Sequence, residues 1–264
     1  NIARTLKKRL NCPWVHTEHW SALTKENGEF ERKSAIFRRF YRSIIKEVDA
    51  FTFVSGYLQR SFNRHFSPSA PQSIISNSVN TTVFHLNPEK SSSKPFRFLH
   101  VSSLGEAKQV EAIIEAFDRI NGKDAELWIV GGSEKKNFEL RKKHTKESLQ
   151  FLPTQSYENI ALLMQDADVL VLNSLYETQS CVAIEALCCG VPVIAPNSGG
   201  PTDLVKHGWT GFLIDTSNSY SLNHSVNQIL HSSEHRLMSE RARESVIHRT
   251  WELVNSQLVS HYKE

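Results

Sequence analysis

No stretch of this sequence approaches the roughly 20 consecutive apolar residues that a membrane-spanning helix needs. The first residues, NIARTLKKRLNCPWV, are basic but lack the apolar core of a secretory signal peptide. Cysteine is scarce: Cys12, Cys181, Cys188 and Cys189 are the four present, and none forms a Cys-x-x-Cys pair. This spacing favours neither a zinc site nor a disulfide framework, so a reducing cytoplasm is the expected location.

The chain also lacks an extreme charge, since its formal net charge is +3 over 264 residues, with 39% hydrophobic and 22% charged residues. These values are ordinary for a globular protein. Positive charge is nevertheless concentrated in residues 1–66, which hold 13 Lys plus Arg against six Asp plus Glu. That excess fits either contact with an anionic membrane surface or acidic acceptor, or the solvated face of a helix predicted over 31–48. No aromatic stacking platform or reader motif accompanies it, so we expect no nucleic acid partner.

Apolar segments alternate with amphipathic ones from about residue 96. We expect strands at FRFLHVSS, ELWIVGG, LQFLP, DVLVLNS, VPVIAP and GFLI, with helices between most of them. Strands that are apolar throughout and separated by helices predict a parallel sheet covered on both faces. The fold class is therefore α/β, with a doubly wound sheet, and ligands should bind outside the carboxyl ends of its strands.

The first 95 residues have the same character but fewer elements. Strands are expected at CPWVHTEHW, AFTFVSG and QSIISNSV, and NPEKSSSKP reads as a linker. We therefore predict an incomplete Rossmann-like domain with its linker at 1–95, a complete Rossmann-like domain at 96–245, and a C-terminal helix at 246–264 that returns toward the first domain.

Two glutamates, Glu177 and Glu185, frame the segment that carries the chemistry. A helix is expected to begin near Ser180, a good N-cap residue, so the backbone N–H groups of Cys181 and Val182 would form an anion site. Glu185 is not three residues after this N-cap, which excludes a capping box. A carboxylate there could accept two hydrogen bonds from a ribose diol. The alternative is an ion pair between Glu185 and a buried Arg or Lys.

The surrounding sequence resembles the donor-binding region of the retaining GT-B glycosyltransferases of family 4. Glu177 and Glu185 have that family's seven-residue interval, and they are followed by EALCCGVPVIA, GGPTDLV and HGWTGFLI. Upstream, FLHVSSLGEAKQVEAIIEAF is similar to its first strand, loop and helix, while CPWVHTEHW and ISNSVNTTVF match motifs of its first domain. The resemblance runs from about residue 11 to the end. It implies a GT-B fold with two Rossmann-like doubly wound parallel-sheet domains.

The resemblance also implies roles for individual residues. Glu185 would hold the ribose hydroxyls of a nucleotide, Glu177 would contact the donor sugar, and Lys108 would neutralise the diphosphate as it leaves. The other implied donor contacts are His19 at the sugar, the N–H groups of Ser180, Cys181 and Val182 at the phosphate, and Leu152 at the base.

The implied reaction transfers a hexose from a UDP- or GDP-linked sugar to an acceptor hydroxyl with retention of anomeric configuration. No metal is expected, because cationic side chains and helix N-termini would replace it. The acceptor would be a glycan or lipid-linked glycan in polysaccharide or glycolipid synthesis, with the enzyme in the cytoplasm or peripheral at the membrane. A nucleotide-sugar epimerase of the same fold and a non-catalytic nucleotide-binding or interaction domain are the alternatives.

The sequence departs from the family pattern in three ways. Ser103 replaces an Arg that usually precedes the diphosphate lysine, and Thr178-Gln179-Ser180 replaces a usual Gly-Phe-Gly. The phosphate cradle would thereby lose a cation and gain a hydroxyl and an amide. The glycine-rich loop and opening strands of the acceptor domain are absent, so we expect this chain to be an N-terminally truncated fragment that is inactive by itself.

Other residues have competing interpretations. His16 and His19 could be metal ligands, although no third ligand is evident. Lys108 could be a solvated lysine that opens an amphipathic helix, and Gly199-Gly200 could allow a close approach of the donor. The vicinal Cys188-Cys189 pair is best explained by helix packing.

Overall fold

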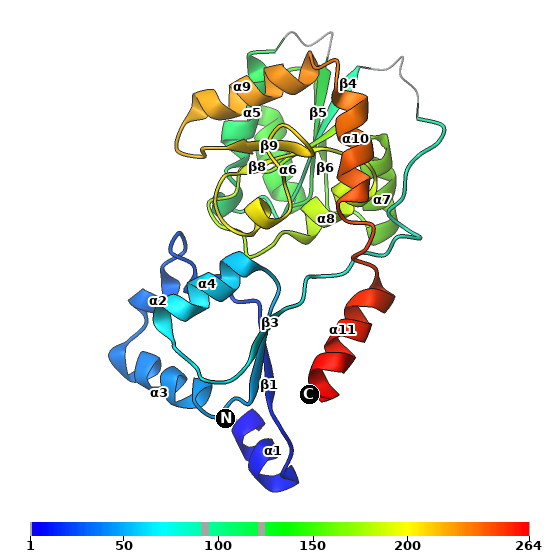
Figure 1. The fold of residues 1–264 in the computed structure, drawn as a ribbon. Helices are drawn as coiled ribbons and strands as arrows, with labels where there is room; N and C mark the ends of the chain where they lie inside the picture. Colours follow the sequence, from blue (N-terminus) through cyan, green and yellow to red (C-terminus); the bar gives the residue numbers. More distant parts are fainter. Residues whose placement is uncertain (1, 91–94, 121–124, 264) are drawn as a thin grey trace.

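The computed structural model describes residues 2–90, 95–120 and 125–263. In the described part, two parallel β-sheets form two units that lie one below the other in Figure 1. The first unit holds a three-stranded sheet in the order β1-β2-β3, with β1 at Val15–Glu18, β2 at Ala50–Phe53 and β3 at Gln72–Ile74. Each of these strands is short, and all are parallel.

An aromatic core joins this first sheet to its helices. The helices are α1 (Ile2–Leu10), α2 (Glu29–Arg32), α3 (Ala35–Ile45) and α4 (Gly56–His65). Phe51 and Phe53 of β2 are fully buried, and both rings contact Phe62 of α4 at 5.1 Å between centroids. Burying large aromatic side chains supplies much of the stabilisation that a small sheet needs.

The sequence-based expectation of one helix over 31–48 is wrong. The chain breaks after α2, and Ser34 starts α3 as an N-cap residue whose Oγ accepts a hydrogen bond from the N–H of Phe37 at 3.2 Å. A serine hydroxyl competes with the helix backbone for hydrogen bonds and therefore favours a helix start over a helix interior. Helix α1 was not expected at all.

The second unit contains a six-stranded parallel sheet in the order β6-β5-β4-β7-β8-β9. Its strands are β4 (Phe96–Val101), β5 (Ala125–Val130), β6 (Leu149–Leu152), β7 (Val169–Val171), β8 (Val193–Pro196) and β9 (Gly211–Ile214). The order reverses between β4 and β7, which is the switch point where doubly wound sheets bind ligands.

Helices cover both faces of this sheet. They are α5 (Val110–Asp118), α6 (Glu134–Lys143), α7 (Tyr157–Asp166), α8 (Cys181–Cys188), α9 (Ser219–Leu230) and α10 (His235–Glu244). One apolar cluster includes Phe117 of α5 and Ile229 of α9, and the other includes Met164 of α7 and Leu187 of α8. The predicted doubly wound α/β architecture is confirmed. Cys188 and Cys189 are buried in the second cluster, as helix packing predicted.

The two units are joined by more than the linker. Helix α11 (Trp251–Lys263) follows α10 and lies beside the first sheet (Figure 1). There, Ser73 Oγ is 3.2 Å from His261 Nδ1. Val79, in the segment after β3, donates its N–H to the carbonyl of Arg249 at 2.9 Å. Among the described residues, no helix is long and apolar enough to cross a bilayer.

Candidate functional site

Loops that follow neighbouring strands meet at the carboxyl edge of the second sheet. Leu175, after β7, donates its N–H to the carbonyl of Ala107, after β4, at 2.8 Å. Gly200, after β8, donates its N–H to the carbonyl of Glu177 at 2.9 Å. A β-carbon at Gly131, after β5, would lie 1.9 Å from the Ser102 carbonyl oxygen, so those two loops also touch. The expected convergence of the strand ends is confirmed.

Lys108 and Glu177 form an ion pair at this edge. The Nζ of Lys108 is 2.5 Å from Oε1 of Glu177, and Ser174 Oγ donates to the same oxygen at 2.9 Å. Lys108 ends a short 3₁₀ turn and does not open α5, because Gln109 has φ 47° and the helix begins at Val110. The interpretation of Lys108 as a solvated lysine is therefore wrong. A phosphate group placed here would meet a cation already held in position.

Helix α8 begins where the sequence predicted. Ser180 is its N-cap residue, and its Oγ accepts a hydrogen bond from the N–H of Ala183 at 3.4 Å. The first-turn N–H groups of a helix have no partner within the helix, so those of Cys181 and Val182 are available to an anion. Ser180 has φ 80°, in the left-handed region that favours glycine. The start of α8 is thus held in a strained conformation.

Glu185 lies one turn inside α8 and is half-buried. Within the described part of the chain, its side chain makes no ion pair or hydrogen bond, which argues against a buried Arg or Lys partner. Burial raises the pKa of this carboxyl to about 7. The pKa of Tyr157, at the start of α7, is also raised, mainly by the burial of its own side chain and secondly by the charge of Glu185. An unpaired carboxylate near a helix N-terminus is suited to accept hydrogen bonds from a ligand.

The other three predicted residues, Ser103, Leu152 and His19, lie at or just after the ends of different strands. Ser103 is exposed in the loop after β4. Leu152 ends β6, its carbonyl accepts the N–H of Gly131 at 3.0 Å, and it lines a pocket of about 450 Å³ beside α7. His19 follows β1 and is exposed, and His16 contacts a different group, since its Nε2 is 3.2 Å from Glu18 Oε2.

Gln179 does not belong to the phosphate cradle, contrary to the sequence-based expectation. Its side chain is only 2% exposed, its Oε1 accepts the N–H of Asn77 at 2.8 Å, and its Nε2 donates to Ser76 Oγ at 2.8 Å. Both partners lie in the segment after β3, more than 100 positions earlier in the chain. The amide therefore binds the first unit and is not available to a phosphate.

Gly199 and Gly200, where the sequence suggested a close approach of the donor, lie close to the backbone of the loop that carries Glu177. A β-carbon at Gly200 would lie 2.1 Å from the Thr178 carbonyl oxygen, and one at Gly199 would lie 2.8 Å from that of Glu177. The glycines are thus needed to seat the loop that carries Glu177. Two serines that bind this loop were not predicted from the sequence: Ser174, three residues after β7, which donates to Glu177, and Ser55, which donates its hydroxyl to the Thr178 carbonyl.

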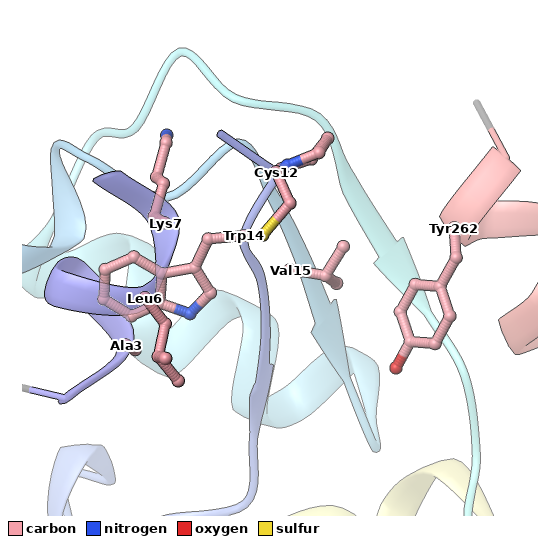
Figure 2. Close-up of a pocket in the computed structure, with 8 residues that line it drawn as sticks. Ala3, Leu6, Lys7, Cys12, Trp14, Val15 and Tyr262 are labelled. Atoms are coloured by element: carbon pink, nitrogen blue, oxygen red, sulfur yellow. The ribbon is translucent and has the colours of Figure 1, made fainter. Parts of the chain in front are cut away.

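A separate pocket lies far from this edge. Figure 2 shows Ala3, Leu6, Trp14 and Tyr262 around a cavity of about 410 Å³ between α1, β1 and α11. None of the predicted site residues lines it. This pocket belongs to the first unit and is not the candidate donor site.

Comparisons with known proteins match both units. The family model described as Glycosyl transferases group 1 matches residues 84–245, and the model described as Glycosyltransferase Family 4 matches residues 2–83. An N-acetyl-alpha-D-glucosaminyl L-malate synthase of Bacillus anthracis is 30% identical over 236 residues, covering 83% of this chain and 59% of the relative. A GDP-mannose-dependent alpha-mannosyltransferase of Mycolicibacterium smegmatis is 38% identical over 105 residues, which is 39% of this chain and 28% of the relative.

Solved structures show the same fold. Sucrose-phosphate synthase from Thermosynechococcus elongatus superposes with a TM-score of 0.85 at 24% identity, covering 99% of this chain and 70% of that one. HepE of Anabaena, solved with UDP-glucose, has a TM-score of 0.82 at 21% identity, covering 98% of this chain and 74% of that one. The GT-B fold expected from the sequence is confirmed. The chain spans 59% of the length of its Bacillus relative, and it belongs to the glycosyl transferases group 1 family.

Proposed function

We propose that this chain carries the donor site of a glycosyltransferase that moves a hexose from a UDP- or GDP-linked sugar to an acceptor hydroxyl, with retention of anomeric configuration. The observation that supports it most is the arrangement of Glu185, the α8 N-terminus and the Lys108–Glu177 pair at one sheet edge. The names of the relatives point the same way, since one depends on GDP-mannose and one structure contains UDP-glucose.

Each group has a distinct part in this proposal. Glu185 accepts hydrogen bonds from the two ribose hydroxyls, and the N–H groups of Cys181 and Val182 bind the diphosphate. Glu177 binds the sugar hydroxyls and orients the anomeric carbon. Lys108, now paired with Glu177, stabilises the negative charge on the diphosphate when its bond to the anomeric carbon breaks.

Four other residues complete the donor contacts. We place the hydroxyl of Ser103 and the N-cap residue Ser180 beside the diphosphate, Leu152 at the base, and His19 at the sugar from the first unit. Ser103 is exposed at the same sheet edge as Lys108, and His19 is exposed at the end of β1, so both side chains are accessible to a ligand.

In this proposal no metal ion is needed to neutralise the charge of the diphosphate. Lys108 and the positive end of α8 face the diphosphate, and these groups can stabilise developing charge without a divalent ion. Donor binding should therefore be the same in the presence of a metal chelator and of added magnesium.

Helix α3 supports a further part of the proposal, a peripheral contact with an anionic membrane that carries a lipid-linked acceptor. Ile36 is 83% exposed and Phe40 is 49% exposed, one turn apart on α3. Arg39 and Arg42 are exposed on the same helix. Exposed apolar and cationic side chains on one short helix are typical of helices that lie in a bilayer surface. In this proposal the enzyme acts at the cytoplasmic face of a membrane, in polysaccharide or glycolipid synthesis.

Calorimetric titration with UDP, GDP and ADP, with and without chelator, tests the donor site directly. Wild-type protein should bind at least one of these three nucleoside diphosphates. Glu185→Gln should weaken the affinity for that nucleotide about tenfold or more, since a hydrogen bond to a charged group contributes about 1.5–3 kcal/mol. Glu158→Gln, which changes an exposed carboxylate of α7, is the matched control and should bind normally. Equal affinity of both variants would remove Glu185 from the proposed role.

A further inference from the structure

The side chain of Gln179 connects the two units at the loop between the two glutamates. Both ends of its amide are hydrogen-bonded, to Asn77 N and to Ser76 Oγ, each at 2.8 Å. Ser76 and Asn77 lie just after β3, so they belong to the segment by which the chain leaves the first sheet. Ser76 Oγ also contacts a guanidinium nitrogen of Arg249, between α10 and α11. One buried side chain thus contacts the first connection between the units directly and the second through Ser76.

The same loop is held on two further sides. Ser55, the N-cap residue of α4, donates its hydroxyl to the Thr178 carbonyl at 2.5 Å and accepts the N–H of Leu58 at 3.1 Å. On the opposite side, Gly200 donates to Glu177 and leaves no room for a β-carbon against Thr178. The loop therefore lies between Ser55 of the first unit and Gly200 of the second.

The conformation of the loop depends on these contacts. Ser180 has φ 80°, and a non-glycine residue in that region persists only where its surroundings fix it. Gln179 precedes Ser180 directly and is two positions after Glu177. Removing its bonds would leave the Asn77 N–H unpaired and release the loop, whereas Glu185, inside α8, would keep its place.

We propose that Gln179 is a positioning residue that makes the placement of Glu177 depend on how the first unit sits against the second. Glu177 is assigned to the sugar and Glu185 to the ribose, so the inference rests on the proposed function. It predicts that binding of the sugar, more than binding of the nucleotide, requires the two units to be in this arrangement.

The test compares Gln179→Met with Gln165→Met. Gln165 is also buried, at 9% exposed, and its Nε2 donates to Val83 O at 3.1 Å, away from the loop. Affinities are measured for UDP, UDP-glucose, GDP and GDP-mannose. In Gln179→Met the ratio of nucleotide-sugar to nucleotide affinity should fall at least about tenfold, with nucleotide affinity within about threefold of wild type. Gln165→Met should keep both values. An unchanged ratio in Gln179→Met, or an equal loss for nucleotide and nucleotide sugar, would overturn the proposal.

A second measurement needs no ligand. Amide hydrogen exchange of Asn77, which donates to Gln179, and of Gly200, which donates to Glu177, should be at least about tenfold faster in Gln179→Met and unchanged in Gln165→Met. Ser76→Ala should act in the same direction, and the double variant should add less than about twofold, because both changes break one connection. If no nucleotide binds the wild-type protein, the donor site proposal fails, while unchanged exchange would refute the role of Gln179 separately.

Discussion

Burial disfavours the charged form of the Glu185 carboxyl. Its pKa is raised from 4.5 to about 7, so between these values the folded protein holds a proton that the unfolded chain has released. Stability therefore falls as pH rises through this window, and it is highest below it. Hydrogen bonds from a diol would favour the ionised form, so a bound nucleotide should offset part of this loss.

The change Glu185→Gln should remove this pH dependence. Relative to wild type, the variant should gain stability as pH rises from about 4.5 to 7, by up to about 3 kcal/mol for a shift of this size. Urea unfolding at several pH values measures the difference between the two proteins. A difference that stays constant over the window would show that the carboxyl titrates normally.

Individual residues were predictable where local sequence decides their place. Ser180 was predicted as the N-cap residue of α8 because a small hydroxyl residue precedes the apolar helix. The burial of Gln179 was not predictable, because its partners are more than 100 positions away. The ion pair of Lys108 with Glu177 was missed for the same reason, since it forms only when the loops after β4 and β7 meet.

At the scale of elements, the start of α8 combines a favourable cap with an unfavourable backbone. Ser180→Gly should lose only a few tenths of a kcal/mol of stability, because the hydroxyl bond to Ala183 is long. It should also remove the backbone strain of the left-handed φ, which costs about 1 kcal/mol or more. We expect a net gain of about 0.5–1 kcal/mol in the free energy of unfolding. Thermal unfolding measures it, and a lower melting temperature than wild type would contradict it.

Helix α3 gives a prediction about membranes. Arg39→Glu/Arg42→Glu should reduce binding to vesicles containing anionic lipid at least tenfold, because each cation near such a surface contributes about 1 kcal/mol. Binding of wild type should also weaken in high salt and be lost on neutral vesicles. Sedimentation with vesicles provides the measurement.

The control for α3 reverses two exposed lysines on α6. Lys135→Glu/Lys142→Glu changes the net charge equally on the second unit and should leave vesicle binding near wild type. If both double variants bind equally well, the positive charge acts through the whole molecule and α3 is not the contact surface.

Most elements of the second unit could be read from the sequence. Most residues of its strands are apolar because helices cover both faces, and this pattern separates the strands from the amphipathic helices. The break between α2 and α3 was missed because no Pro or Gly marks it, and only Ser34 signals a new start. Helix α1 was missed because it buries no residue, and its apolar side chains Ile2, Leu6 and Leu10 are exposed.

The whole molecule is held together by polar contacts between its units as well as by the chain. Asp203, after β8, accepts the N–H of Tyr57 at 3.0 Å at the N-terminus of α4, and it lies 3.7 Å from Arg60. A carboxylate at a helix N-terminus stabilises the helix through its dipole. This residue therefore binds the first unit to the loop that follows the two glycines.

Asp203→Asn should weaken the contact between the units without changing either core. The free energy of unfolding should fall by about 0.5–1.5 kcal/mol, whereas Glu139→Gln, on the exposed face of α6, should change it by less than about 0.5 kcal/mol. Chemical denaturation compares the two variants. Equal effects would mean that Asp203 contributes no more than an ordinary surface charge.

The close approach of Gly200 to Thr178 has a consequence for engineering the site. Attempts to change donor choice would naturally randomise residues 178–180, which lie between the two glutamates. Because the Thr178 carbonyl occupies the space that a β-carbon at Gly200 would need, any new loop must keep this backbone path or be selected together with a change at 199–200. A library that varies one segment alone samples side chains on a fixed loop, and only a library that varies both can move the loop.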